Sequence, residues 1–280
     1  MSDGGRVAIL TGAAGGIGRA LTEALLGAGI RVAAVDRTAE GLAALTAGAQ
    51  ARGHAAALLT IEADLAGDSA PAEIVGRARS HFGKIDILIN NAGVGQATLR
   101  AENWQQPIRF WEVRPDQWRL FVAVHTTAPL ALATAVMPDM VDAHWGRIVN
   151  VTTSLGTMIR SGSPTYGPSK AALEALSAIM AKDLDGTGVT VNVLVPGGVT
   201  NTPMVPQESG FDRSEMIQPE AMAAPLLWLV SEGAAEVTGR RFLAVHWDSK
   251  LAPEQAAEKA GSPVAWTEIA TMPIEPARRS

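Results

Sequence analysis

The strongest constraint on the fold of this chain is a regular alternation of short apolar runs with longer segments rich in alanine and leucine. Strands that are apolar on both faces, rather than alternating, are typical of a parallel sheet covered by helices on both sides. The pattern predicts an α/β protein with a doubly wound parallel sheet, the Rossmann fold. Predicted strands are 6–11, 31–35, 56–61, 86–90, 147–151, 190–195 and 241–245, and predicted helices are 16–28, 39–52, 72–82, 115–143, 169–185 and 219–231.

The chain of 280 residues has no linker rich in Pro, Gly or Ser, which predicts a single domain. We expect residues 1–246 to form the Rossmann-type domain and 247–280 to be its C-terminal extension. That tail carries Trp247 and Trp266, and it could cover the pocket of a neighbouring subunit, wrap the surface of its own domain or be partly disordered.

Composition restricts the location and partners of the protein. The chain has no cysteine, which suits the cytoplasm, and 47% hydrophobic residues, enough for a large core. Its net charge is −5 and it has no block of Lys or Arg, so nucleic acid is not an expected partner. The longest apolar stretches, 129–137 and 223–230, are too short to span a bilayer, and we expect no membrane partner.

A glycine-rich segment, TGAAGGIG at 11–18, connects the first predicted strand to the first predicted helix. Gly12 permits a tight turn, Gly16 permits close approach to a pyrophosphate, and Gly18 lets the helix pack against the sheet. A purely structural turn could use the same residues, but the strand–turn–helix context favours a dinucleotide site. The residues expected to border the cofactor here are Gly12, Ala14, Gly16, Ile17 and Gly18.

An acidic residue follows the second predicted strand, about twenty residues after the glycine turn, as in dinucleotide-binding folds. Asp36 at this position could accept hydrogen bonds from the adenosine ribose hydroxyls and repel the 2′-phosphate of NADP. Alternatively, it could cap the helix that begins near Thr38. The adjacent Arg37 could contact a 2′-phosphate. We expect NAD as the cofactor, with NADP less favoured.

The segment Tyr-Gly-Pro-Ser-Lys at 166–170 opens a predicted helix. Residues four apart share a helix face, so Tyr166, the only tyrosine of the chain, and Lys170 can point into one site. A phenol with an ordinary pKa near 10 must lose ~2–3 units to exchange protons near neutral pH. A nearby ammonium and a positively charged nicotinamide could lower the pKa by that amount. The alternative is a tyrosine at a helix start beside a solvent-facing lysine.

Several motifs follow one another in a particular order: Thr11-Gly12-(x)3-Gly16-Ile17-Gly18, Asp64-Leu65, Asn90-Asn91-Ala92-Gly93, Tyr166-(x)3-Lys170 and Pro196-Gly197. With these motifs the chain resembles the single-domain branch of the short-chain dehydrogenases/reductases, over roughly residues 6–245.

The resemblance implies an NAD(H)-dependent alcohol dehydrogenase or ketone reductase, which transfers hydride between nicotinamide C4 and a secondary alcohol or ketone. Tyr166 would be the general acid/base, and Lys170 would bind the nicotinamide ribose and lower the pKa of the tyrosine. It also implies a homotetramer or homodimer built from helices 115–143 and 169–185. Further residues that the resemblance places at the cofactor are Asp64, Leu65, Asn91, Ala92, Gly93, Gly197, Val199 and Thr202.

Two positions depart from the family pattern. The serine expected after the fifth strand falls by spacing on Thr153, whose hydroxyl has the same hydrogen-bonding capacity, with Ser154 beside it. Both residues could instead be part of a turn. An asparagine expected in the helix around 118–140 is replaced by His125, which could relay protons toward Lys170 or be a buried structural histidine.

Three segments are expected to line the substrate pocket, namely 94–114, 155–165 and 204–218. Their aromatic and methionine side chains favour a hydrophobic, ring-containing alcohol or ketone. Alternatively, these side chains pack the loops onto the domain or onto another subunit. They are Trp104, Phe110, Trp111, Met158, Met204, Phe211 and Met216.

Two other functions compete with this one. The altered positions 153 and 125 allow a dinucleotide-binding regulator or scaffold without catalysis, although the intact Tyr166 and Lys170 oppose it. A sugar epimerase or dehydratase is opposed by the glycine spacing and the modest substrate region. The histidines are scattered, so no metal site is expected.

Overall fold

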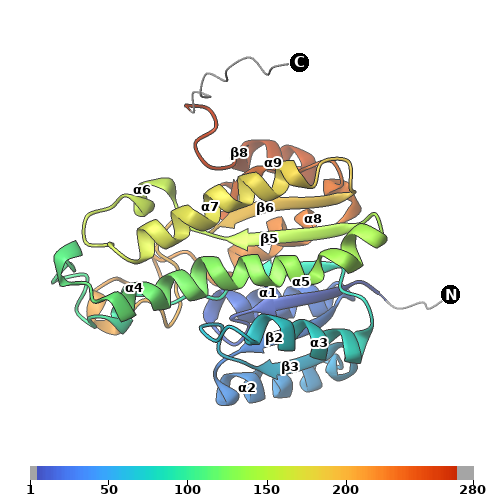
Figure 1. Ribbon diagram of the computed structural model, residues 1–280, viewed down its shortest axis with the longest axis horizontal. Helices are drawn as coiled ribbons and strands as arrows, with labels where there is room; N and C mark the ends of the chain where they lie inside the picture. Colours follow the sequence, from blue (N-terminus) through green and yellow to red (C-terminus); the bar gives the residue numbers. More distant parts are fainter. Residues whose placement is uncertain (1–4, 270–280) are drawn as a thin grey trace, which may run out of the picture.

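The computed structural model describes residues 5–269, which form an eight-stranded sheet between two layers of helices (Figure 1). Neighbouring strands pair in parallel except for the last pair, β7 and β8, which is antiparallel. The order across the sheet is β3-β2-β1-β4-β5-β6-β7-β8. The strands are β1 (Val7–Thr11), β2 (Arg31–Asp36), β3 (Leu58–Glu62), β4 (Ile87–Asn90), β5 (Gly146–Val151), β6 (Val189–Val195), β7 (Arg240–Leu243) and β8 (Gly261–Pro263).

The predicted doubly wound fold is therefore confirmed. After β3 the chain returns to the other side of β1 and continues with β4, so the winding direction changes between β1 and β4. In such sheets, ligands bind outside the carboxyl ends of the strands at this switch point. The helices are α1 (Gly16–Gly27), α2 (Ala39–Ala51), α3 (Ala70–Phe82), α4 (Pro115–Val122), α5 (Ala128–Asp142), α6 (Leu155–Met158), α7 (Tyr166–Asp183), α8 (Ala223–Leu229) and α9 (Pro253–Ala260).

The two faces of the sheet bury two separate cores. Along β1, Ala8 and Leu10 belong to the core under α1, α2 and α8, whereas Val7 and Ile9 belong to the core under α3, α5 and α7. Successive side chains of a strand point to opposite faces, so a strand covered on both sides must be apolar at every position. This requirement explains the continuous apolar runs in the sequence.

Some elements differ from their predicted form. The predicted helix 115–143 is interrupted by a π-helical turn, Ala123–Thr127, between α4 and α5. The predicted helix 219–231 begins with a 3-10 turn, Pro219–Met222, before α8. Single π-helical turns change which side chains face inward, and they are frequent at functional sites.

Helix and strand structure continues beyond the last predicted strand, 241–245. Residues 253–263 form α9 and β8, and β8 extends the sheet beside β7. Trp247 packs within its own domain, with its ring centroid 5.6 Å from that of Trp228. The expectation of a tail beyond the last strand was wrong for this part. Residues 270–280 of the predicted extension lie outside the described residues.

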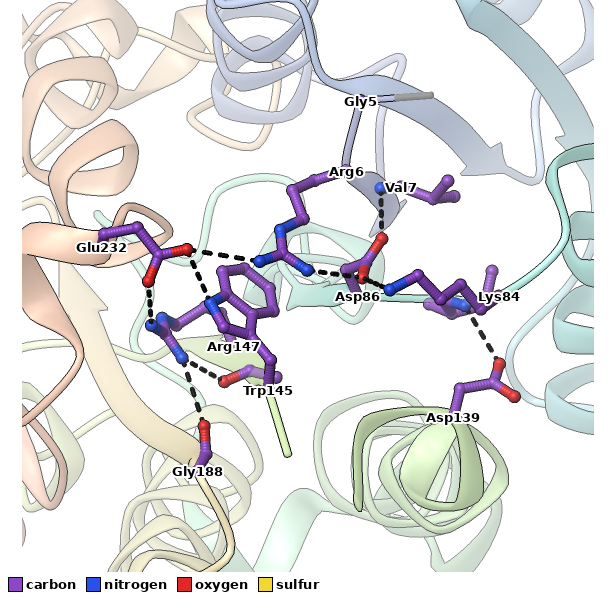
Figure 2. Close-up of polar contacts among 12 residues, drawn as sticks. Gly5, Arg6, Val7, Lys84, Asp86, Asp139, Trp145, Arg147, Gly188 and Glu232 are labelled. Carbon is purple, nitrogen blue, oxygen red and sulfur yellow. Dashed lines mark hydrogen bonds and ion pairs between the residues drawn. The ribbon is translucent and has the colours of Figure 1, made fainter. Parts of the chain in front are cut away.

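A polar cluster closes the amino ends of β1 and β4, opposite to the carboxyl ends (Figure 2). Asp86 is only 2% exposed, accepts a hydrogen bond from the Val7 N–H at 2.9 Å, and pairs with Arg6 at 3.1 Å and Lys84 at 3.0 Å. The Arg6 guanidinium lies 3.6 Å from the Trp145 ring centroid. The buried carboxylate thus has several partners, which offset the cost of removing it from water.

Within the described residues, the helical span Pro115–Asp142 is long and apolar enough to cross a membrane by length and composition alone. Its inward side chains Leu132, Val136 and Met140 are fully buried against the sheet. Core helices of soluble proteins can have the same length and composition, so these two properties alone are weak evidence for a membrane segment.

Candidate active site

The glycine turn between β1 and α1 has no room for larger side chains. Gly12 adopts a positive φ of 65°, and a Cβ on Gly18 would lie 1.9 Å from the Gly12 carbonyl oxygen. A Cβ on Gly16 would lie 2.6 Å from Cγ2 of Thr202, which the loop after β6 brings over the turn. No side chain caps the first turn of α1, so backbone N–H groups remain for a ligand. This backbone cradle fits a pyrophosphate.

Asp36 joins the end of β2 to the glycine turn. Its Oδ2 accepts a hydrogen bond from the Ala14 N–H at 3.0 Å. Its Oδ1 accepts bonds from the N–H and hydroxyl of Thr38 at 3.1 and 2.8 Å. The N-cap of α2 is Thr38, so Asp36 does not cap the helix itself. Asp36 instead fixes Thr38, the residue before the helix. The neighbouring Arg37 is exposed.

The end of β4 is fastened to the end of β1 at the switch point. The Asn91 amide donates to the carbonyls of Thr11 and Gly12 at 2.9 and 3.2 Å. The Thr11 hydroxyl accepts the N–H groups of Asn91 and Ala92, both at 3.1 Å. A Cβ on Gly93 would lie 3.1 Å from Nε2 of His125. These contacts place the Asn91–Gly93 backbone directly beside the glycine turn.

The remaining predicted cofactor residues lie in turns at the same end of the sheet. The Asp64 carboxylate accepts the Ala66 N–H of its own turn at 3.0 Å, and Leu65 is buried in the core. Gly197 has a φ of 103°, and the Val199 carbonyl accepts the Ile217 N–H at 3.0 Å. Ile17 is half-buried and packs against the core below α1.

Tyr166 and Lys170 occupy one face of the first turns of α7. The Lys170 ammonium donates to the Val151 carbonyl, at the end of β5, at 2.9 Å. Lys170 is 3% exposed, and this burial lowers its pKa to about 8. Lys170 is thus a buried cation held against a strand end, not a solvent-facing lysine, and that alternative interpretation was wrong.

The surroundings of the Tyr166 phenol favour its neutral form. Burial raises its pKa, while a hydrogen bond with the Thr153 side chain and the charge of Arg160 act in the opposite direction. The groups that oppose the rise do not include Lys170, whose ammonium is directed to a backbone carbonyl. Ionisation of the phenol therefore requires a further positive charge in the site.

Thr153, rather than Ser154, is the hydroxyl that meets the tyrosine. Thr153 is the second residue after β5, and its side chain lies close enough to the Tyr166 phenol to lower its pKa. Ser154 is the N-cap residue of α6, where its carbonyl accepts the Thr157 N–H at 2.8 Å. Thr153 therefore stays the predicted residue for the hydroxyl role.

His125 lies inside the π-helical turn, and both of its ring nitrogens are engaged. Nε2 accepts the Val94 N–H at 2.9 Å, which places the ring proton on Nδ1, 2.8 Å from the Ser169 hydroxyl. Ser169 in turn donates to the Tyr166 carbonyl at 3.0 Å. Burial, helped by the charge of Lys170, lowers the pKa of His125 well below its ordinary value. The imidazole is therefore neutral and links the β4 end to the start of α7.

The predicted pocket loops make contact with each other. Trp104 packs edge-on against Phe211, with ring centroids 4.9 Å apart, and the Arg160 guanidinium lies 4.8 Å from the Trp104 ring centroid. The Gln105 side chain also donates to the Glu208 carbonyl. These contacts bring the segments 94–114 and 204–218 together over the carboxyl end of the sheet.

The apolar side chains of these loops do not all face one pocket. Met158 and Met216 are buried, 4% and 8% exposed, which agrees with packing onto the domain. Phe110 and Trp111 pack edge-to-face at the surface, 75% and 70% exposed. Met204 lies against Gly95.

A buried ion pair next to the site was missed by the sequence analysis. Glu174 in α7 bonds Arg241 in β7 at 2.9 Å, and Arg241 donates to the Thr153 carbonyl at 3.0 Å. The available signal was a charged residue among the apolar residues of each element, with Glu174 on the same helix face as Lys170. Among residues 5–269, no group of three or more His, Asp and Glu side chains could hold a metal ion.

The sequence and the architecture match a known family. The sequence matches the family described as short chain dehydrogenase over residues 6–211, and the chain belongs to that family. The resemblance inferred from the motifs is confirmed.

Individual relatives have different reactions. The 3-oxoacyl-(acyl-carrier-protein) reductase of Pseudomonas aeruginosa is 29% identical over 248 residues, covering 85% of this chain and 95% of the relative. The D-threitol dehydrogenase of Mycolicibacterium smegmatis is 32% identical over 245 residues, covering 84% and 89%.

Solved structures show the same fold with different nucleotides. A Beutenbergia cavernae protein assigned as an NAD(P)-dependent gluconate 5-dehydrogenase, with bound NADP, has a TM-score of 0.73 and 28% identity, covering 86% of this chain and 95% of that one. The 3-ketoacyl-(acyl-carrier-protein) reductase of Brucella melitensis, complexed with NADH, has a TM-score of 0.73 and 25% identity, covering 86% and 97%.

Proposed function

We propose that this short-chain dehydrogenase is an NAD(H)-dependent oxidoreductase acting on a secondary alcohol or the corresponding ketone, with Tyr166 as general acid/base. The observation that carries the proposal is the cluster at the end of β5. There the Thr153 side chain lies close enough to Tyr166 to lower the pKa of the phenol, and the buried Lys170 ammonium lies one helical turn further along α7.

Each side chain has a distinct role in the proposed reaction. When bound, the nicotinamide accepts hydride in oxidation and supplies it in reduction. Tyr166 Oη takes a proton from the substrate hydroxyl in oxidation and returns it in reduction. The Thr153 hydroxyl donates a hydrogen bond to the phenolate or to the substrate oxygen. The buried Lys170 ammonium would hold the nicotinamide ribose and add positive charge near the phenol.

We propose NAD rather than NADP because the Asp36 carboxylate stands at the end of β2 beside the glycine turn. The two solved relatives carry different nucleotides, NADP in one and NADH in the other. The proposal therefore depends on the charge of Asp36, opposed by the exposed Arg37. Backbone around Asn91, Gly93 and Thr202 would complete the cofactor site.

We propose a small, largely apolar substrate, since Trp104 and Phe211 meet over the carboxyl end of the sheet. We also propose a homotetramer or homodimer in the cytoplasm. Apolar side chains on α4, α5 and α7 that remain exposed support such an assembly; they are Trp118, Leu130, Val141 and Ile179.

The test is Tyr166→Phe, which removes the proton-carrying oxygen and leaves the ring. We expect turnover in a panel of secondary alcohols with NAD, followed by NADH absorbance, to fall by roughly 10²–10⁴-fold. NADH affinity, measured by fluorescence titration, should remain within a few-fold of wild type. A Tyr166→Phe enzyme that retains wild-type turnover would contradict the mechanism.

A dinucleotide-binding scaffold of the same fold is the alternative. Tight NADH binding by the wild-type protein, with no absorbance change across a broad alcohol and ketone panel, would favour it. A third function, a sugar epimerase or dehydratase, would return the cofactor to its starting state after each turnover. Net production or consumption of NADH would exclude that function.

A further inference from the structure

A buried carboxylate lies two helical turns beyond Tyr166, on the face of α7 that carries Tyr166 and Lys170. Glu174 is 0% exposed. Its Oε2 accepts the Thr152 hydroxyl at 2.7 Å, and its Oε1 accepts Arg241 Nε at 2.9 Å and the Ala265 N–H at 3.2 Å. The carboxylate thus joins α7 to the end of β5, to β7 and to the segment after β8.

The cation of this pair also reaches the active-site hydroxyl. Arg241 is 5% exposed, and its Nη2 donates to the backbone carbonyl of Thr153 at 3.0 Å. The Glu174 carboxylate therefore holds the Thr152 hydroxyl, and the Arg241 guanidinium holds the Thr153 carbonyl. Because the Thr152 side chain and the Thr153 backbone are both fixed, the Thr153 side chain has little freedom to move.

A buried ion pair contributes little net stability compared with apolar residues of similar volume. Glu174 and Arg241 each have a buried apolar neighbour in sequence, Leu173 and Phe242 respectively. An apolar pair would suit those surroundings, but it could not bond the Thr153 carbonyl. Stability of the core alone therefore does not account for the pair.

We propose that Glu174 and Arg241 are positioning residues, which hold segment 152–154 so that the Thr153 hydroxyl meets Tyr166. The proposal rests on the proposed function in taking Thr153 and Tyr166 as the reacting pair. The same carboxylate bonds Ala265, which has a left-handed φ of 59°, an uncommon conformation for alanine. The C-terminal strand β8 is thereby attached to the segment that carries Thr153.

The test uses the fact that Tyr166 is the only tyrosine of the chain. With tyrosine labelled by 13C at Cζ, one NMR signal reports the ionisation midpoint of this phenol in the folded protein without any substrate. Thr153→Val removes the hydroxyl and sets the reference upward shift, since the Thr153 side chain lowers the pKa of Tyr166.

Arg241→Lys is the most informative variant. It keeps a cation beside Glu174 but loses the second guanidinium nitrogen, Nη2, which bonds the Thr153 carbonyl. We expect its midpoint to rise in the same direction as that of Thr153→Val, by at least half of the reference shift. The double variant Glu174→Leu/Arg241→Met, which removes both charges without leaving one unpaired, should show the same rise. Adding Thr153→Val to either variant should give little further change.

Asp86→Asn is the matched control, since Asp86 is a similarly buried, paired carboxylate at the opposite end of the sheet (Figure 2). It should lower the melting temperature and leave the Tyr166 midpoint unchanged. The proposal is overturned if Thr153→Val moves the midpoint and the Arg241 variants do not. It is also overturned if Thr153→Val itself has no effect, or if Asp86→Asn gives the same rise.

Kinetics separate this proposal from the proposed function. With a substrate identified, Arg241→Lys should lower kcat about tenfold or more, with the NADH dissociation constant unchanged. If the wild-type protein turns over no alcohol or ketone while the midpoints shift as expected, the proposed activity fails and the positioning role stands.

Discussion

His125 shows at the residue scale how context decides what a titratable group does. Its position in the sequence suggests a proton relay, but the ring accepts the Val94 N–H and faces the Ser169 hydroxyl. Both contacts suit a neutral imidazole. We therefore propose that His125 orders the end of β4 and the start of α7 rather than carrying protons itself.

The low pKa of His125 predicts a loss of stability in acid. Below pH 6.5 the unfolded chain binds a proton that the buried ring excludes, so the contribution of His125 is present above that pH and is lost as the pH falls. Between pH 7 and 5, the wild-type unfolding free energy should fall more steeply than that of His125→Asn. Urea titrations at several pH values measure the difference.

Ser169→Ala is the control for this prediction, since it removes the hydrogen-bond partner but keeps the imidazole. It should retain the pH dependence of the wild type. Equal slopes for wild type and His125→Asn would show that the ring does not exclude the proton.

At the element scale, α1 shows which glycines the site requires. A Cβ on Gly18 would lie 1.9 Å from the Gly12 carbonyl oxygen, whereas a Cβ on Gly27, at the other end of the same helix, meets nothing within 4 Å. The first glycine permits the helix to start against the turn. The second lies at an exposed helical position and has no such role.

Gly18→Ala should therefore lower the unfolding free energy by about 1–3 kcal/mol and weaken NADH binding at least tenfold, because the turn must shift. Gly27→Ala should raise the unfolding free energy by about 0.5–1 kcal/mol and leave binding unchanged. Chemical denaturation and NADH fluorescence titration measure both effects. Similar behaviour of the two variants would argue against a steric role for Gly18.

At the scale of the whole molecule, cofactor binding and folding are linked, since the cradle involves α1, β2, β4 and the loop after β6. NADH at one hundred times its dissociation constant should stabilise the folded chain by about 2.7 kcal/mol. Thermal shift with equal concentrations of NADH and NADPH should show a larger shift for NADH, because Asp36 repels the 2′-phosphate.

Asp36→Asn removes the charge and keeps the acceptor toward the Ala14 N–H, so the difference between the two cofactors should shrink or reverse. Arg37→Ala is the complementary variant, and it should weaken only NADPH. A larger NADPH shift in the wild-type protein, lost in Arg37→Ala, would contradict the assignment to NAD.

Much of the fold follows from the sequence alone, since its determinants are local. A parallel strand covered on both faces needs apolar residues such as Val7, Ala8, Ile9 and Leu10 in succession. The tight turn and the close start of α1 need glycine for steric reasons within a few residues. These constraints identify the order of the elements, the dinucleotide cradle and the pairing of Tyr166 with Lys170.

Only the tertiary structure decided which groups near Tyr166 act together. The tautomer of His125 and the pairing of Glu174 with Arg241 depend on atoms far apart in the chain. So does the antiparallel strand β8, which pairs with β7 although its sequence, Gly-Ser-Pro, has no strand pattern. Hydrogen bonds in a buried site depend on distances of tenths of an ångström, which packing of the whole domain sets and residue spacing does not.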